Sequence, residues 1–345
     1  MSGADIDPAA LESWLLANVQ GFAGPLAISR FAGGQSNPTY RLDTPARSYV
    51  LRRQPPGRLF KGAHAVDREA RVVTALAAAG YPVAPIHALC TQREVIGSWF
   101  YVQDLVEGRV FWDARLPDVP REDRAAYYLA MAQTHAALHA IDPVAVGLED
   151  YGRPGNYVAR QVARWTEQYL ADEDAGRDPH MDRLIAWLPG AIPASAECGA
   201  AIIHGDYRID NMIFDPVEPR VRAVIDWELS TLGHPLADFV YGAMAYQMPP
   251  HIVAGLAGAD LGSLGIPDEQ AYVAAYCERA GLDGVPDYQF YIAFNFFRIA
   301  AIFHGIKGRF LRGAASSANA AERARLFPEL AALAWHKALH AGAKE

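Results

Sequence analysis

The sequence predicts an α+β chain built in two parts, a small sheet-based part followed by a larger, mostly helical one. In the first part, short apolar segments alternate with turns rich in Gly and Pro, a pattern typical of strands. After Glu107-Gly108 the apolar residues follow helical spacing instead. The 345 residues, 51% of them hydrophobic, suffice for one large or two medium domains. We expect a first domain at 1–103 and a second at 104–345, with a hinge at 103–108.

The first part begins with a helix at 8–19 that carries its apolar residues on one side. A second, stronger helix at 65–79 ends before Gly80 and Pro82, residue types that commonly terminate helices. Strands are predicted at 26–31, 40–42, 49–52, 86–89 and 99–105. Together these elements indicate a small sheet crossed by one helix.

The second part opens with long helices, which are predicted at 121–141 and 157–170 and are followed by a polar loop at 172–179. Short strands are predicted at 202–204, 212–215 and 222–225, the last two pairing as a hairpin. An aromatic-rich segment at 288–306 is apolar nearly all round, which indicates a buried helix. Alternatively, one face of this helix lines the acceptor pocket.

Charge and cysteine usage exclude several classes of protein. The formal net charge is −8, which disfavours binding to nucleic acid or to an acidic membrane surface. Cys90, Cys198 and Cys277 are far apart and odd in number, so they form neither a disulfide framework nor a zinc motif. No apolar run approaches the roughly 18 residues that span a bilayer. We expect a cytoplasmic monomer or homodimer with a small molecule as its partner.

The most informative stretch is 204–228. It contains His204-Gly205-Asp206, with Asn211 five residues after the aspartate, and then Asp226 beyond the predicted hairpin. Phosphoryl transfer requires a carboxylate that accepts the proton of the acceptor hydroxyl and oxygen ligands for magnesium. Asp206 suits the first role, Asn211 and Asp226 suit the second, and His204 is expected to orient the loop from a buried position.

Other interpretations of single residues remain. His-Gly-Asp alone is equally typical of a tight turn with a capping aspartate. His135 and His139 lie four apart, which is metal-ligand spacing, but the Glu of His-Glu-x-x-His is missing, so we prefer structural histidines. Two other interpretations of the whole chain remain. It could be a nucleotide-binding module without transfer activity or a metallohydrolase.

Three blocks resemble the aminoglycoside phosphotransferase family, a branch of the protein-kinase-like fold that includes choline and homoserine kinases. They are His204-Gly205-Asp206 with Asn211, Ile225-Asp226-Trp227-Glu228, and Gly233-His234-Pro235-Leu236-Ala237-Asp238-Phe239. The resemblance implies a bilobal fold, with a small, mainly antiparallel-sheet nucleotide-binding lobe and a larger, mostly helical catalytic lobe. It implies Mg²⁺-dependent transfer of the γ-phosphate of ATP or GTP to a small-molecule hydroxyl. It also implies that Asp206 is the catalytic base and that Asp238 is a buried brace of its loop.

The resemblance further implies a phosphate-contacting cation and a carboxylate partner in the first lobe. The family usually has lysine where this chain has Arg52 and Arg53. Because side chains alternate along a strand, only one of the two can point inward, and we prefer Arg52 with Glu69 as its partner. A loop expected to cover the phosphates contains Gly34, Gln35, Ser36 and Asn37, and the linker expected to meet the purine ring contains Gln103 and Leu105.

The acceptor is less strongly specified. The acidic second part permits a cationic aminoglycoside, but Arg208 and Arg298 do not favour one; if buried, each needs an anionic partner from the protein or the acceptor. The runs 50–57 and 64–69 most resemble the branch of the family that is fused to acyl-CoA dehydrogenases. That resemblance suggests a hydroxyacyl compound or its CoA ester as the acceptor.

Overall fold

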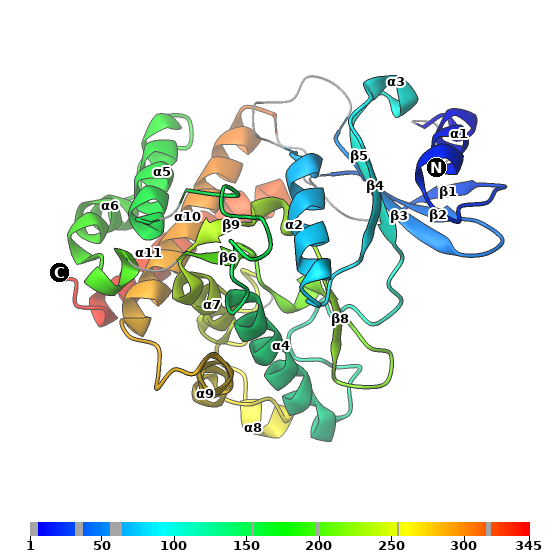
Figure 1. Ribbon diagram of the computed structural model, residues 1–345. Helices are drawn as coiled ribbons and strands as arrows, with labels where there is room; N and C mark the ends of the chain where they lie inside the picture. The colour runs from blue at the N-terminus through cyan, green and yellow to red at the C-terminus, as the bar shows by residue number, and fades with distance from the viewer. Residues whose placement is uncertain are drawn as a thin grey trace. The chain divides into compact units, whose positions relative to one another are not determined.

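The structure is a computed structural model that describes residues 6–31, 37–55, 64–153, 155–197, 200–253, 255–314 and 319–345 (Figure 1). By packing, the chain divides into two compact units. The first comprises Met1–Arg109, Val146–Leu148 and Asn211–Ser230, and the second comprises Val110–Ala145, Glu149–Asp210 and Thr231–Glu345. The lobe boundary expected between residues 103 and 104 stays a prediction. The α+β class with an antiparallel sheet and a mostly helical remainder is confirmed.

A five-stranded antiparallel sheet forms the centre of the first unit. Its order is β1-β2-β3-β5-β4, so that β5 lies between β3 and β4. The strands are β1 (Ala27–Arg30), β2 (Thr39–Asp43), β3 (Ser48–Arg53), β4 (Ile86–Cys90) and β5 (Phe100–Asp104). Each coincides with a predicted strand to within two residues at either end.

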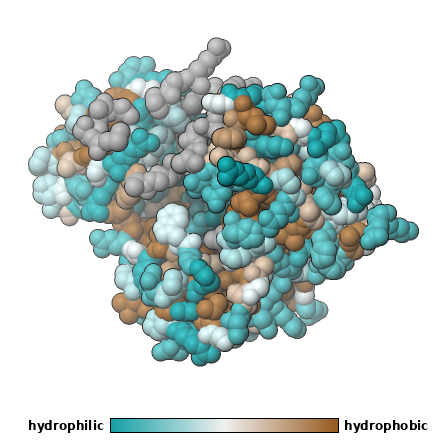
Figure 2. Space-filling view, turned by 180° about the vertical axis from the view of Figure 1, so that it is seen from behind, coloured by the Kyte–Doolittle hydropathy of each residue, from teal (hydrophilic) through white to brown (hydrophobic). Residues whose placement is uncertain are grey.

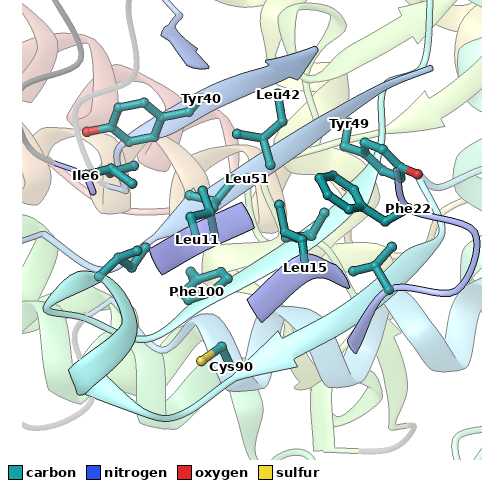
Figure 3. Packing of buried hydrophobic residues seen from close by; sticks show 13 residues of the cluster. Ile6, Leu11, Leu15, Phe22, Tyr40, Leu42, Tyr49, Leu51, Cys90 and Phe100 are labelled. Atoms are coloured by element: carbon teal, nitrogen blue, oxygen red, sulfur yellow. The ribbon is translucent and has the colours of Figure 1, made fainter. Parts of the chain in front are cut away.

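The helices α1 (Pro8–Asn18) and α2 (Val66–Ala78) pack against different residues of this sheet. Leu11 and Leu15 of α1 join a buried cluster with Phe100 and Val102 of β5 (Figure 3). Tyr101, which lies between them in sequence, packs instead with Val66 and Ala70 of α2. Because side chains alternate along a strand, the two helices cover opposite faces of the sheet.

The strands β7 (Met212–Phe214) and β8 (Val221–Val224) pair as the predicted hairpin. By packing, this hairpin belongs to the first unit, although its strands were predicted as part of the second domain. The residue after β8, Ile225, donates its amide hydrogen to the Asn211 carbonyl at 2.9 Å, and Val224 donates to the Pro82 carbonyl at 2.9 Å. The Trp227 ring packs edge-on against Tyr81. These contacts fix the hairpin end next to the C-terminal end of α2.

The second unit is mainly helical. A pair of strands, β6 (Ala201–Ile203) and β9 (Thr231–Gly233), forms its small sheet. Its helices of nine or more residues are α4 (Arg124–His139), α5 (Tyr157–Ala171), α6 (Pro179–Ala191), α7 (Pro235–Ala243), α9 (Glu269–Ala280), α10 (Tyr288–Leu311) and α11 (Ala320–His340). Short helices are α3 (Arg93–Ile96) in the first unit and α8 (Leu261–Leu264) in the second.

The aromatic-rich segment forms α10, and the prediction of a buried helix is confirmed. Phe290, Phe294, Phe296 and Phe297 are all buried on it, and α5, α7 and α11 pack around it. Figure 2 shows mostly polar residues on the face that it draws, with apolar residues interspersed among them. Within the described residues, no helix is both long and apolar enough to cross a membrane.

Candidate active site

Arg52 is the centre of a charged cluster in the first unit. Its Nε lies 2.8 Å from Glu69 Oε2, and its Nη2 lies 2.6 Å from Asp226 Oδ1 and 3.6 Å from Glu228 Oε2. The Arg52 side chain is only 16% exposed. Three carboxylates thus surround one guanidinium, so the cluster carries an excess of negative charge whenever all three are ionised. Such a surplus suits the binding of a further cation.

Glu69 is the most buried of these carboxylates. It accepts hydrogen bonds from Asn37 Nδ2 at 2.6 Å and from the Tyr101 hydroxyl at 3.2 Å. Burial raises the pKa of Glu69 to about 7; Arg52 opposes this increase, and Asp226 and Glu228 add to it. The structure therefore brings together Asn37, Arg52 and Glu69, all predicted from the sequence.

We expect the raised pKa of Glu69 to make stability depend on pH. The folded protein holds this proton more tightly than the unfolded chain does, so the stabilisation is complete below about pH 4.5 and is lost as the pH rises through about 7. Without magnesium or nucleotide, Glu69 should lower the free energy of unfolding by on the order of 1–3 kcal/mol between roughly pH 5 and 8. Denaturant titrations across this range should show a smaller decrease in Glu69→Gln. Glu107→Gln, which changes an exposed carboxylate, serves as the control; equal slopes in wild type and Glu69→Gln would contradict the expectation.

The remaining residues predicted to bind nucleotide have different placements. Arg53 points away from Arg52, because its Nε donates to Ser98 Oγ and its Nη2 to the Ile96 carbonyl, both at 2.8 Å. Gln103 lies on β5 opposite Val50, and Leu105 follows the end of that strand; both are partly buried. Gly34, Gln35 and Ser36 lie outside the described residues.

Asp226 lies just beyond β8, next to the backbone pair of Asn211 and Ile225. Its backbone has φ +66° and ψ +61°, a left-handed conformation that is uncommon outside glycine but that Asp tolerates better than most residues. Its side chain is 33% exposed. The hairpin register therefore brings the Asn211 and Asp226 positions close together at the same end of the hairpin. Carboxylate and amide oxygens are the ligands that Mg²⁺ prefers, so this pair fits a magnesium site.

The other predicted catalytic residues lie in the second unit. His204 and Asp206 belong to a loop that we call the His204 loop, residues 204–210. Asp238 of α7 lies beneath it, fully buried. Its two oxygens accept the backbone amide hydrogens of His204 at 2.9 Å and of Gly205 at 2.8 Å. Gly205 has φ +82°, a conformation that glycine adopts without strain. Asp238 therefore fixes the backbone just before Asp206.

His135 and His139 of α4 also bind Asp238. Their Nε2 atoms lie 3.0 and 3.3 Å from Asp238 Oδ2. Burial lowers the pKa of His135 to about 3, so this ring is neutral and donates one hydrogen. Burial alone would raise the pKa of Asp238, but the hydrogen bonds from the two histidines keep it well below its usual value. This network accounts for the spacing of four residues between His135 and His139.

We expect Asp238→Ala to destabilise the protein by about 3–5 kcal/mol, because it leaves buried amide and imidazole groups without their acceptor. The measurement is the free energy of unfolding from denaturant titration. Asp268→Ala is the matched control, since Asp268 only accepts an amide hydrogen at the start of α9 and its loss should cost about 1 kcal/mol. A loss no larger than that of the control would show that Asp238 does not fix the loop.

Asp206 is half-buried, and its amide hydrogen points to His204 Nδ1 at 3.2 Å. The Tyr241 hydroxyl donates to Asp206 Oδ1 at 2.5 Å. Tyr241 was not among the predicted site residues. The signal was available, however, because Tyr241 lies three residues after Asp238 on α7 and therefore on the same face of that helix.

Both predicted acceptor-binding arginines have partners within the second unit. Arg298 is buried, donates from Nη2 to the Gly205 carbonyl at 2.6 Å, and lies over the Tyr241 ring. Arg208 forms an ion pair with Asp210 two residues later, with 3.0 Å between Nε and Oδ1. Their contact with an acceptor stays a prediction.

Comparison with known proteins decides the family. Residues 27–294 match the sequence pattern described as "Phosphotransferase enzyme family". The chain belongs to the phosphotransferase enzyme family. The chain is 42% identical over 321 residues to mouse acyl-CoA dehydrogenase family member 10, covering 92% of this chain but 30% of the mouse protein. It is 41% identical over 334 residues to chicken acyl-CoA dehydrogenase family member 11, covering 94% of this chain but 42% of that protein.

Solved structures agree with this family. The chain matches a Ralstonia eutropha protein, classed provisionally as an aminoglycoside phosphotransferase, with 47% identity and a TM-score of 0.89 over 98% of this chain and 99% of that one. Choline kinase from Cryptosporidium parvum is only 11% identical, with a TM-score of 0.60 over 97% of this chain and 95% of that one, and shares the fold. The predicted family and its kinase-like fold are confirmed.

Proposed function

We propose that this phosphotransferase is a Mg²⁺-dependent kinase that transfers the γ-phosphoryl group of ATP or GTP to the hydroxyl group of a small molecule. The observation that supports this most is the placement of Asp206 on a loop whose backbone amides are fixed by a buried carboxylate. A carboxylate held in this way can accept a proton without moving. General-base assistance of this kind accelerates a reaction by about 10²–10⁴.

In the proposed reaction, Asp206 accepts the proton of the acceptor hydroxyl. The hydroxyl oxygen of the acceptor bonds to the γ-phosphorus, and the bond between the γ-phosphorus and the nucleoside diphosphate breaks. Arg52, held by Glu69, contacts the phosphates. Asn211 and Asp226 would hold Mg²⁺, which when bound neutralises charge on the phosphates. The loop with Gly34, Gln35, Ser36 and Asn37 would cover the phosphates, and Gln103 and Leu105 would meet the purine. His204 and Asp238 position Asp206.

We propose a hydroxyacyl compound or its CoA ester as the acceptor. The relatives named acyl-CoA dehydrogenase family members support this class, although the chain spans less than half of their length. An aminoglycoside is the second candidate, supported by the classification of the Ralstonia eutropha protein. We further propose a cytoplasmic monomer or homodimer. The net charge of −8 disfavours nucleic acid or an acidic membrane surface as a partner.

The test measures the release of ADP or GDP in a coupled assay. The assay contains Mg-ATP or Mg-GTP and one of two sets of acceptors, hydroxyacyl-CoA esters or aminoglycosides. The proposal expects nucleotide turnover that requires both Mg²⁺ and an acceptor from one set. A metallohydrolase would instead cleave substrates without nucleotide, and a nucleotide-binding module would bind nucleotide without turnover.

A further inference from the structure

An apolar pocket lies in the second unit, beside the His204 loop. Its cavity volume is about 50 Å³. Arg208, Ile209 and Asp210 of the His204 loop line one side, and Tyr241 lines it while donating its hydroxyl to Asp206. The other lining residues are Ala114, Tyr128, Met131, Gly242, Met244, Ala245, Tyr246, Met248, Val253, Tyr272 and Ile299. One side chain, Tyr241, therefore contacts both the pocket and the proposed base.

The composition of the lining selects against a polycation. Among the lining residues, the only charged side chains are Arg208 and Asp210, and these two pair with each other. The lining thus has no unpaired carboxylate to offer an ammonium group. Its methionines and tyrosines instead suit an aliphatic chain, which gains about 0.8 kcal/mol for each methylene that leaves water.

Two hydroxyl groups in the lining lack hydrogen-bond partners. The rings of Tyr128, Tyr246 and Tyr272 pack together, with centroids 5.5 to 6.3 Å apart. Tyr128 donates to the Ala114 carbonyl at 2.5 Å. Tyr246 and Tyr272 are only 8% and 0% exposed, and within the described part of the chain neither hydroxyl has a partner. A buried hydroxyl without a partner is costly, so a ligand oxygen that accepts its hydrogen would bind favourably.

We infer that this pocket binds the aliphatic chain of the phosphoryl acceptor, a hydroxyacyl compound whose carbonyl oxygen accepts a hydrogen bond from Tyr246 or Tyr272. The inference rests on the proposed function, because that function supplies the hydroxyl to be phosphorylated. It adds the part of the acceptor that is recognised and the residues that recognise it. Burial raises the pKa of both tyrosines well above its ordinary value, so both remain hydrogen-bond donors at neutral pH.

The first test is calorimetric titration of the protein with methyl esters of 3-hydroxybutanoate, 3-hydroxyhexanoate and 3-hydroxyoctanoate. We expect the affinity to rise about fourfold for each added methylene that the pocket buries. Ala245→Leu, which fills part of the pocket, should remove this gain for the longest ester. Equal affinity along the series, or an unchanged series in Ala245→Leu, would overturn the inference.

The second test separates the hydroxyl groups from general packing. Tyr246→Phe and Tyr272→Phe should weaken binding of the esters by about threefold to tenfold and leave binding of 2-alkanols of equal length, which lack the carbonyl, unchanged. Neither variant should lower the melting temperature, because each removes a hydroxyl that has no partner. Tyr291→Phe, which changes a buried tyrosine that does not line the pocket, should leave ester binding unchanged. The carbonyl contact would be wrong if neither pocket variant weakened ester binding. It would also be wrong if the variants weakened the binding of esters and of 2-alkanols equally.

A parallel measurement of ADP release with the same esters distinguishes the inference from the proposed function. Binding that depends on chain length and on Ala245, but without ADP release, would support the pocket and contradict transfer to these alcohols. ADP release that is insensitive to chain length and to Ala245→Leu would support the proposed kinase function and contradict the binding of the acceptor chain in this pocket.

Discussion

Asp206→Asn is expected to lower kcat by about 10²–10⁴, because the amide cannot accept the proton of the acceptor hydroxyl. The substitution keeps the size and shape of the side chain, and its carbonyl oxygen can still accept from Tyr241. Nucleotide affinity in the presence of magnesium should therefore stay within about threefold of the wild type. Steady-state kinetics and calorimetric titration with ADP measure the two quantities.

The matched control is Asp215→Asn, which makes the same chemical change in the turn between β7 and β8. Asp215 accepts the amide hydrogens of Val217 and Glu218, and nothing assigns it to the site. Its kcat should be close to that of the wild type. Acceptor-dependent turnover by Asp206→Asn at the wild-type rate would show that Asp206 is not the base.

Asp226→Ala is expected to abolish the contribution of magnesium to nucleotide binding. If Asp226 and Asn211 hold the ion, removal of the only carboxylate of the pair leaves the phosphates without their counter-charge. In the wild type, titration with ATP should show a higher affinity in the presence of Mg²⁺ than in its absence. The ratio of these two affinities should be at least about tenfold smaller in the variant.

Glu228→Ala is the control for this change, because it also removes a carboxylate near Arg52, at 3.6 Å, without removing a proposed metal ligand. It should keep the dependence of nucleotide binding on magnesium. If the two variants lost this dependence equally, the effect would come from the charge around Arg52 and not from coordination of the ion.

Much of the fold could be predicted because its elements have strong local signals. The strand Ser48–Arg53 contains an apolar run, and because side chains alternate along a strand, Arg52 and Arg53 have different partners in the structure. Strand β9 was not predicted, because three residues ending in Gly233 show no periodicity. A Cβ atom at Gly233 would lie 2.4 Å from Ile203 Cδ1, so the glycine reflects a close approach to β6 that local sequence does not reveal.

The candidate site was predictable where chemistry and spacing coincide in one segment, as in His204-Gly205-Asp206 with Asn211. The supports of that loop come from distant segments and depend on packing. His135 and His139 suggest a metal site by spacing, yet in the structure they donate to Asp238, about a hundred residues later. Arg298 was expected to need an anionic partner, but in the structure it donates to the Gly205 carbonyl and lies over the Tyr241 ring.

The most direct test of phosphoryl transfer is ³¹P NMR of the protein with Mg-ATP and a mixture of hydroxyacyl-CoA esters, repeated with aminoglycosides. The proposed function predicts a new phosphomonoester resonance that grows in step with ADP, and only with one of the acceptor sets. Formation of inorganic phosphate without a phosphomonoester, or conversion of the acceptor in the absence of nucleotide, would contradict it.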